Sequence, residues 1–511
     1  MKSDDNVLYS LPYAKNSFGF WILFFVLNGI VLFGVYAWSI QFETGLGVTG
    51  LNNYVSWGIY LTNFIFFVGI SHAGTLISAI LRITNWEGRK PITRMAEAIT
   101  VFSLLVGAPM IIADLGRADR VLNILFFGRL QSPLLWDVIS ISVYLTGSML
   151  YLYLPMIPDL AFLRDRKDFS VWRRKIYKFL AMNWQNAPEQ KILLEKSIKI
   201  MAVVIVCVAP MVHTVVSWVY GMTLRPGWHS TIFGIYYVVG AIFSGTAAII
   251  TVMAIFRKIY KLQNIVTFEH FKFLGILMMV FNIIYIYLTF SEYLTIGYGG
   301  KTEDIHLLTM LFKGEYAGLF WLTMVLIAAP LIIMVWPHKT ISSIVLASVL
   351  VNIGMWLKRF LITVPSLKTT FLPLEGLDLA RAAYYPTWVE WAITAAGFAA
   401  LALFFVLFSK FFPILSVWEI KEKAPESNSK ESLIPAYTVF ILILIIVTSL
   451  TFIILQNLIF LEKTSLAVII APHTKPILLA ILIPPAIVLS MYFRVLKNIF
   501  KIRRIHKNSL S

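Results

Sequence analysis

The sequence predicts an all-α membrane protein that crosses the bilayer about 12 times. Of its 511 residues, 59% are hydrophobic and 14% are charged, and the mean hydropathy is +0.79. In soluble domains about a quarter of the residues are charged. The apolar residues also fall in blocks that are long enough to cross a bilayer core of roughly 30 Å. A soluble globular domain is excluded, because no fold in water could bury so many such blocks.

Twelve apolar blocks account for the predicted spans. They lie at about 19–40, 54–83, 94–113, 134–158, 196–222, 231–256, 273–297, 316–337, 342–363, 387–412, 434–457 and 477–497. Loops after even-numbered blocks are rich in Lys and Arg, whereas the loop at 41–53 has neither. Because basic loops stay on the cytoplasmic side, we expect both termini in the cytoplasm and the protein in a prokaryotic cytoplasmic (inner) membrane.

Loop composition also divides the chain into regions. The most polar stretch, EIKEKAPESNSKES, reads as a linker between ten helices and a C-terminal hairpin of two. We therefore expect an N-terminal cytoplasmic segment, a membrane core with two four-helix bundles, a cytoplasmic linker, and a hairpin with a basic tail. Their predicted ranges are 1–18, 19–412 (bundles at 54–222 and 231–363), 413–432 and 433–511.

The net charge of +17 does not indicate nucleic-acid binding, because the basic residues lie between apolar blocks and not on one domain. The segment from Asp165 to Lys196 is basic with interspersed aromatic residues, which predicts that it lies along the cytoplasmic membrane surface. The single cysteine, Cys207, lies in an apolar run. The chain therefore has no disulfide framework and no Cys-ligated zinc or iron–sulfur site.

Ionisable residues inside predicted spans are candidates for function, because each costs several kcal/mol at mid-bilayer without a partner. The second span carries His72, the third carries Glu97 near its cytoplasmic end and Asp114 at its external end, and the fourth opens with Asp137. Polar residues follow Asp137 at helical spacing and form one face turned away from lipid: Ser140, Tyr144, Ser148 and Tyr151. Small residues on the same face as His72 should let another helix approach closely: Gly69, Thr75 and Ala79.

This stepped set suits a quinone head group, which needs a proton donor or acceptor at each carbonyl and an apolar cleft for its tail. The alternative is a set of ordinary inter-helix hydrogen bonds. His72 and His213 could instead be axial ligands of a b-type haem on facing helices. In the second half, we expect Glu292, Arg359 and Glu390 to be interface anchors or partner contacts near the external ends of their helices.

Several motifs, in order, resemble one family. They are NYVSWGIYLTNFIFFVGISHAGTLISAILRI, RMAEAIT, IADLGRADR, SPLLWDVISISVYLTGSMLYLYLPMIPDLAFLRDR, NIGMWLKRFLITVPSL and YYPTWVEW. Over roughly residues 15–418 the chain resembles the NrfD/PsrC family of quinone-interacting membrane subunits (polysulfide reductase NrfD-like), and most closely the large membrane subunits of alternative complex III. It departs from that subgroup at Asp114, where His is common, and at Val219 and Lys358, where acidic residues are frequent.

The resemblance implies a quinol site near the external face and a possible role in proton translocation. It also implies an external iron–sulfur partner, which serves a molybdopterin-family or multihaem cytochrome subunit, with other membrane subunits and lipid around the chain. Residues carried over by motif match are His72, Asp114, Arg117 and Asp137.

The leading hypothesis is the quinone-reactive membrane subunit of a respiratory oxidoreductase complex, with menaquinone or ubiquinone as substrate, no haem or iron–sulfur cluster in this chain, and no activity alone. The catalytic candidates are His72, Asp137 and Asp114; the quinone-binding candidates are His72, Asp137, Tyr144 and Arg117; and the proton-path candidates are Glu97, His72, Ser140 and Ser148. The alternative is a quinone-free anchor and proton-conducting paralogue in the same kind of complex. A third hypothesis, a secondary transporter, requires broken helices in both halves, and no matched pair is visible.

Overall fold

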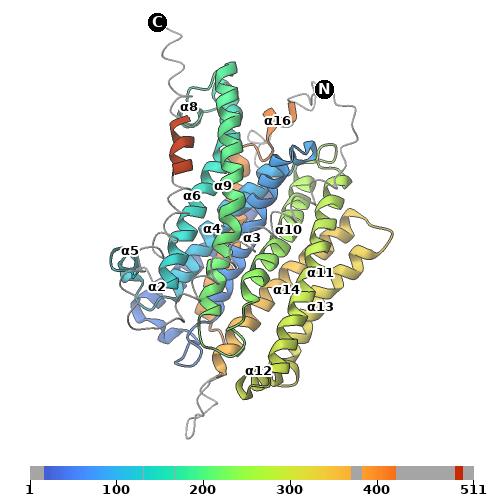
Figure 1. Cartoon of the computed structure of the whole chain (residues 1–511). Helices are drawn as coiled ribbons and strands as arrows, with labels where there is room; N and C mark the ends of the chain where they lie inside the picture. The colour runs from blue at the N-terminus through green and yellow to red at the C-terminus, as the bar shows by residue number, and fades with distance from the viewer. Residues whose placement is uncertain (1–16, 130–131, 167–168, 370–382, 422–489, 499–511) are drawn as a thin grey trace, which may run out of the picture.

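The computed structural model describes residues 17–129, 132–166, 169–369, 383–421 and 490–498, and within these residues it is helical without strands (Figure 1). Ten of the described helices are long and apolar enough to cross a membrane. They are α2 (Phe18–Thr44), α3 (Ile59–Ile83), α4 (Thr93–Asp114), α6 (Pro133–Tyr153) continued by α7 (Ile157–Asp165), α9 (Pro188–Gly221), α10 (Phe233–Ile259), α11 (Phe268–Gly299), α13 (Ala317–Val335), α14 (Ile341–Lys368) and α15 (Trp388–Phe411). The prediction of an all-α, multi-pass membrane protein is confirmed.

The first ten predicted spans match these helices within several residues at each end. The eleventh, at 434–457, lies outside the described residues. Of the twelfth, only residues 490–498 are described, and they are helical. This short helix packs on the core, because the Tyr492 hydroxyl donates to the Val143 carbonyl at 3.1 Å and the Asn498 amide donates to Ser197 Oγ at 3.1 Å.

Local sequence explains where several helices begin. Pro133 and Pro188 occupy the first turns of α6 and α9, where a missing N–H costs nothing. At the start of α15, Glu390 accepts the backbone N–H of Thr387 at 2.9 Å and closes a capping box.

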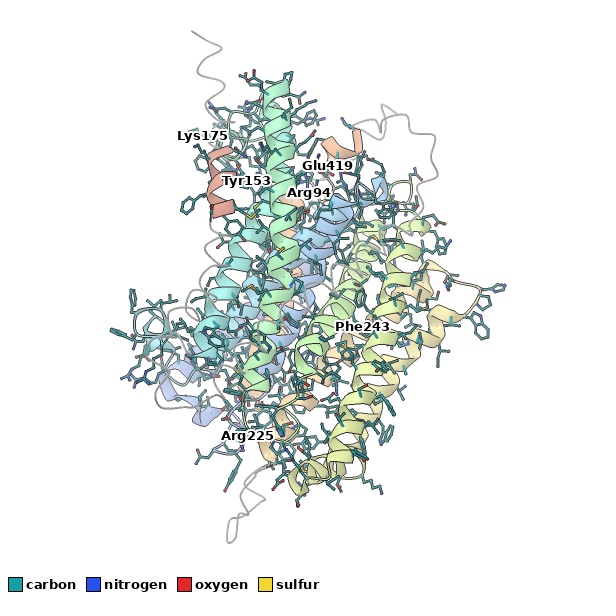
Figure 2. The ribbon with its side chains drawn as sticks, in the orientation of Figure 1. Arg94, Tyr153, Lys175, Arg225, Phe243 and Glu419 are labelled. Atoms are coloured by element: carbon teal, nitrogen blue, oxygen red, sulfur yellow. The ribbon has the colours of Figure 1, made fainter. Side chains whose placement is uncertain are left out.

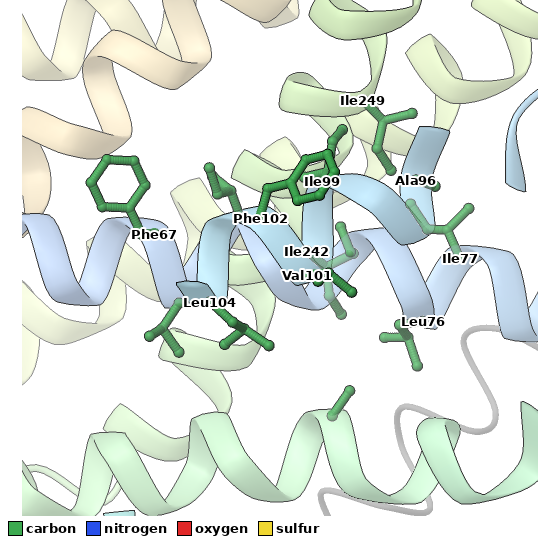
Figure 3. Packing of buried hydrophobic residues seen from close by; sticks show 14 of the residues in the cluster. Phe67, Leu76, Ile77, Ala96, Ile99, Val101, Phe102, Leu104, Ile242 and Ile249 are labelled. Atoms are coloured by element: carbon green, nitrogen blue, oxygen red, sulfur yellow. The ribbon is translucent and has the colours of Figure 1, made fainter. Parts of the chain in front are cut away.

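Helix α3 is the centre of the molecule. It packs against α4, α9, α10 and α14, and its most apolar stretch is entirely buried. Figure 3 shows side chains of α3, α4 and α10 meeting in this core, among them Phe67, Ile99 and Ile242.

The tightest contacts on α3 are made at two glycines that the sequence analysis did not name. A Cβ on Gly74 would lie 2.1 Å from the Ala96 carbonyl oxygen of α4, and one on Gly245 of α10 would lie 2.4 Å from the Ala73 Cβ. A Cβ on Gly69 would meet nothing closer than 3.8 Å. That distance is ordinary van der Waals contact with Ser244 and Ala241 of α10, so another helix does approach at Gly69, less tightly than at Gly74.

Eight of the described long helices form two rings of four, and α3 of the first ring also packs against the second. In one ring α3, α4, α6 and α9 pack against one another, and in the other α10, α11, α13 and α14 do so. Helices α10 and α14 also pack on α3, while α2 packs on α15. Figure 1 shows α8 (Val171–Leu180) and α16 (Val417–Lys421) at one end of the molecule and α5 (Asn123–Phe126) and α12 (Thr302–Phe312) at the other.

The first part of the predicted linker is not a free polar segment. Residues 413–417 are buried, and Asp159 accepts the backbone N–H of Val417 at 3.3 Å and of Trp418 at 3.0 Å. Asp159 is also paired with Arg94 at 2.7 Å, and Arg94 donates to the Leu415 carbonyl at 2.7 Å. The polar sequence of residues 419–432 predicted a linker, but residues 413–418 and the rest of α16 pack on the core. Figure 2 shows Arg94 and Glu419 toward the same end of the molecule.

Candidate functional site

His72 lies near the middle of α3 and is 2% exposed. Its Nδ1 lies 2.7 Å from the Val68 carbonyl oxygen, which can only accept, so Nδ1 carries the proton and donates. Its Nε2 has no hydrogen-bond partner among the described residues. The Val68 carbonyl therefore holds the ring on its own helix, and the backbone of Ala209 on α9 is a second neighbour of the imidazole.

Tyr144 of α6 lies beside His72, with ring centroids 4.9 Å apart. Its hydroxyl lies 2.7 Å from Thr75 Oγ1 and donates to the Ser71 carbonyl at 3.1 Å. Thr100 of α4 also donates to the Ser71 carbonyl, at 2.5 Å, and accepts from the Thr75 N–H. The structure thus brings the predicted His72 and Tyr144 together and adds residues of α3 and α4 that the pattern did not single out.

A second cluster of polar side chains lies next to these residues, toward the end of the molecule that carries α16. Ser78 donates to Glu97 Oε1 at 2.6 Å and contacts the Tyr151 hydroxyl at 3.4 Å. Arg82 lies 3.4 Å from the same Glu97 oxygen and donates to Glu419 Oε1 at 2.7 Å. These side chains, with His72, Thr75 and Tyr144, are called the polar column below. The column consists of residues one turn apart on α3 and their partners on α4 and α6.

The column is closed by Glu419. This side chain is 3% exposed and is held by Arg82 and by Arg89, whose Nη1 donates to Oε2 at 2.6 Å. Burial alone would raise the pKa of Glu419, but the two guanidinium groups outweigh it and hold the pKa at about 2. Glu419 is therefore a fixed anion that caps the end of the column.

Two predicted carboxylates lie at the opposite end. Asp137 and Asp114 are both buried, and neither Asp114 oxygen nor Asp137 Oδ1 has a hydrogen-bond partner among the described residues. Asp137 is seven residues from Tyr144, roughly 10 Å along α6 at 1.5 Å per residue. Asp137 is therefore separated by about two helical turns from the residue that contacts His72.

The remaining predicted residues have different surroundings. Ser140 donates to the Asp137 carbonyl of its own helix at 3.0 Å, and the buried Ser148 Oγ has no partner among the described residues. The Arg117 side chain is 64% exposed and pairs with Asp119 at 3.0 Å. The hydrogen bond from Arg117 is the main reason that the pKa of Asp119 is lowered. Arg117 is thus a surface residue and not part of the buried set.

His213 of α9 was considered in the sequence analysis only as a possible axial haem ligand together with His72. Its ring lies 4.5 Å from that of His72, and neither of its nitrogens has a hydrogen-bond partner among the described residues. The two rings are in van der Waals contact, so this arrangement leaves no room between them for an iron atom and its porphyrin. The pair does not fit a haem, and the two histidines instead form a buried imidazole pair.

The second ring of helices holds buried charges, which corrects the expectation of interface anchors. Glu292 of α11 lies 3.6 Å from Lys358 of α14, and both are almost fully buried. Arg359 stacks over Tyr237 at 4.9 Å, and its two terminal nitrogens have no hydrogen-bond partner among the described residues. Glu390 is also buried, at the start of α15, where it accepts the Gly50 N–H at 2.7 Å.

Comparison of the sequence with family models identifies the family of this chain. The family model described as "Polysulphide reductase, NrfD" matches residues 47–370. The chain belongs to the NrfD family. The match covers α3 to α14, and so contains the polar column apart from Glu419, the two buried carboxylates Asp114 and Asp137, and His213. The predicted family resemblance is confirmed, although no comparison separates the alternative complex III subgroup from other members.

Three relatives of this NrfD-family chain are matched over nearly their whole lengths. The chain is 24% identical to a selenate reductase subunit of Mesobacillus selenatarsenatis, with 77% of this chain and 94% of that protein covered. It is 23% identical to the "Hdr-like menaquinol oxidoreductase integral membrane subunit" of Archaeoglobus fulgidus, with 80% and 98% covered. It is 23% identical to the "Menaquinone reductase, integral membrane subunit" of Nitratidesulfovibrio vulgaris, with 78% and 93% covered.

Proposed function

We propose that this chain is the quinone-reactive membrane subunit of an oxidoreductase complex, with menaquinone as its substrate. Two observations support the substrate: the names of two relatives refer to menaquinol or menaquinone, and the buried set contains unpartnered proton acceptors at membrane depth. The single observation that carries the proposal is the pair of buried carboxylates, Asp137 and Asp114, at one end of a polar column: among the described residues, neither Asp114 oxygen nor Asp137 Oδ1 has a hydrogen-bond partner. A buried carboxylate without a partner is costly in a membrane and marks a ligand or proton pathway.

The chemistry assigns separate roles to the two ends of the site. Oxidation of a quinol releases two electrons and two protons. We assign Asp137 as the group that accepts the first proton, because it opens α6 from the side that we expect to be external, with His72 and His213 as deeper acceptors. The exposed Arg117 lies at the same side and is a candidate contact for the docked partner.

Electrons must leave through another protein. The chain has one cysteine, and among the described residues no three His, Cys, Asp or Glu side chains are grouped so that they could hold a metal ion. We therefore propose an iron–sulfur partner on the external face, which passes electrons between the quinone and a further catalytic subunit. The name of the selenate reductase relative supports a multi-subunit assembly of this kind.

The polar column supports a route for protons toward the cytoplasmic end. From Tyr144 the hydroxyls of Thr75 and Ser78 lead to Glu97, and hydroxyl and carboxyl groups of this type both donate and accept protons. The same hydroxyl and carboxyl groups would also serve the alternative function, a proton-conducting paralogue without quinone. Quinone content separates the two: the purified complex should hold about one menaquinone per chain under the first proposal and none under the second.

The test compares Asp137→Asn with Asp119→Asn in the purified complex. Asp137→Asn keeps the size of the side chain and removes the base, so we expect quinol turnover to fall by roughly 10²-fold, the lower range for lost general-base catalysis. Asp119→Asn changes the same charge on an exposed side chain of the same side and should leave turnover unchanged. His72→Ala should also lower turnover. If Asp137→Asn and His72→Ala both assemble with unchanged activity, the site lies elsewhere and these residues serve packing.

A further inference from the structure

A pocket of about 460 Å³ opens at the end of the molecule that carries α8 and α16, apart from the polar column and the buried carboxylates. Its walls come from α7, from the loop before α9, from the first turns of α9 and from α16. Trp184 and Trp418 supply apolar surface, and Ala161 lies in the wall that α7 contributes. None of the residues assigned to quinone or proton chemistry lines it.

The loop beside the pocket has a fixed and unusual shape. Met182, Asn183 and Asn186 have positive φ angles of 48°, 57° and 62°. Asn tolerates this region, but for Met it is sparsely populated and costs energy. The buried Gln190 side chain holds the loop by accepting the Gln185 N–H at 2.9 Å. A strained backbone that is held by a buried side chain is typical of ligand sites.

The charges around the pocket are mixed but favour an anion. Three cationic side chains and two acidic ones line it, a net charge of +1: Arg164, Lys191, Lys421, Asp165 and Glu195. Arg164 donates to both oxygens of Asp165, at 2.7 and 2.8 Å, so these two neutralise each other. Lys191 has no ion-pair partner within the described ranges. Lys421 lies over the ring of Phe162, another lining residue, with its Nζ 5.6 Å from the ring centroid.

The neighbouring helix α8 sets the pocket at the membrane surface. Helix α8 packs on α7, and it exposes large apolar side chains, Val171, Trp172, Ile176 and Phe179. It also carries basic residues, Arg173, Arg174, Lys175 and Lys178. A short helix with this composition lies in the plane of the interface, with its apolar side chains in the acyl region and its basic ones at the head groups.

We propose that the pocket binds the phosphodiester head group of an anionic phospholipid, from the leaflet on the side of α8 and α16. Lys191 and Lys421 contact the phosphate, and Trp184 and Trp418 pack against the glycerol region. Basic pockets at the ends of membrane helices bind lipid head groups in this way. Because Trp418 precedes Glu419 on α16, a bound lipid would also help to hold α16 on the core.

The experiment measures lipid binding to the purified protein by native mass spectrometry, with phosphatidylglycerol, phosphatidylcholine and inorganic phosphate as probes. The variant Lys191→Gln with Lys421→Gln removes both proposed phosphate contacts. The matched control is Lys196→Gln with Lys199→Gln, which removes the same charge from exposed positions of α9 that do not line the pocket. We expect phosphatidylglycerol binding to weaken by on the order of 30-fold in the pocket variant, since each Lys near a membrane surface contributes about 1 kcal/mol. The control should stay within about threefold.

A third variant, Ala161→Phe, fills the pocket without a change of charge and should also abolish retention of the lipid. Equal loss in the pocket and control variants would overturn the proposal, as would equal retention of phosphatidylcholine or competition by inorganic phosphate at the concentrations that bind lipid. The proposal would also be overturned if the pocket variant kept its lipid and lost a bound protein partner. Quinol turnover is measured in parallel and is expected to be unchanged in the pocket variant, so the lipid site and the proposed quinone function fail independently.

Discussion

Glu419 gives the sharpest test of how the α16 segment is attached to the membrane core. Its carboxylate joins two parts of the chain that lie far apart in sequence, because it pairs with Arg82 at the end of α3 at 2.7 Å and with Arg89 of the following loop at 2.6 Å. Substitution Glu419→Gln keeps the shape of the side chain and removes its charge. Both guanidinium groups then lose an anion in a buried site.

The size of the effect follows from the pKa of Glu419. The usual value of 4.5 falls to about 2 in the folded protein, and at 1.36 kcal/mol per unit this corresponds to roughly 3 kcal/mol of stabilisation at neutral pH. Removal of one partner from a buried ion pair costs about 3–5 kcal/mol. The two estimates agree, so we expect Glu419→Gln to destabilise the protein by about 3 kcal/mol.

The assay is denaturant or thermal unfolding of the purified protein in one detergent across a pH series. Because the folded pKa lies below the unfolded one, the stabilisation by Glu419 is fully present above about pH 4.5 and is lost as the pH falls toward 2. The difference between the wild-type protein and Glu419→Gln should therefore be constant from pH 7 to pH 5 and shrink only below that.

The matched control is Glu87→Gln. Glu87 lies at the same end of the molecule and pairs with Lys90 at 2.5 Å, but its side chain is 43% exposed. An exposed pair contributes about 0–1 kcal/mol, so this variant should stay close to the wild type. An equal loss of stability in both variants, or a Glu419→Gln difference that disappears by pH 6, would refute the reasoning.

Three further predictions follow from the packing. Gly74→Ala should prevent normal accumulation of folded protein in the membrane, because its Cβ would lie 2.1 Å from the backbone of α4, whereas Gly69→Ala should accumulate normally; similar yields of both would show that the α3–α4 contact adjusts. Glu292→Gln should lower thermal stability more than the double variant Glu292→Gln with Lys358→Met, because the single change leaves an additional buried cation uncompensated; additive effects in the double-mutant cycle would contradict this. A chain that ends at Lys421 should retain the resistance of the α3–α4 loop to proteolysis, while a chain that also lacks α16 should lose it; equal proteolysis of the two would show that α16 does not stabilise this end.

The sequence by itself determined the membrane class and the approximate positions of ten helices. In lipid every backbone polar group must be satisfied within its own helix, so a span needs about 20 apolar residues and can be read directly from hydropathy. The same reasoning identified His72, Asp114 and Asp137 as costly ionisable groups, since the cost of burial depends on the residue and its depth. The family motifs were equally visible, because they are local strings of residues.

Only the tertiary structure decided which of these groups meet. His72 contacts His213, which lies 141 positions later in the chain, and Arg82 pairs with Glu419, which lies 337 positions later. Contacts of this kind depend on the rotation and register of one helix against another. Membrane helices have little hydrophobic driving force between them, so small residues and polar contacts set that register. A hydropathy pattern does not show which glycine allows the tightest approach, so the close contact of Gly74 with α4 was found only in the structure.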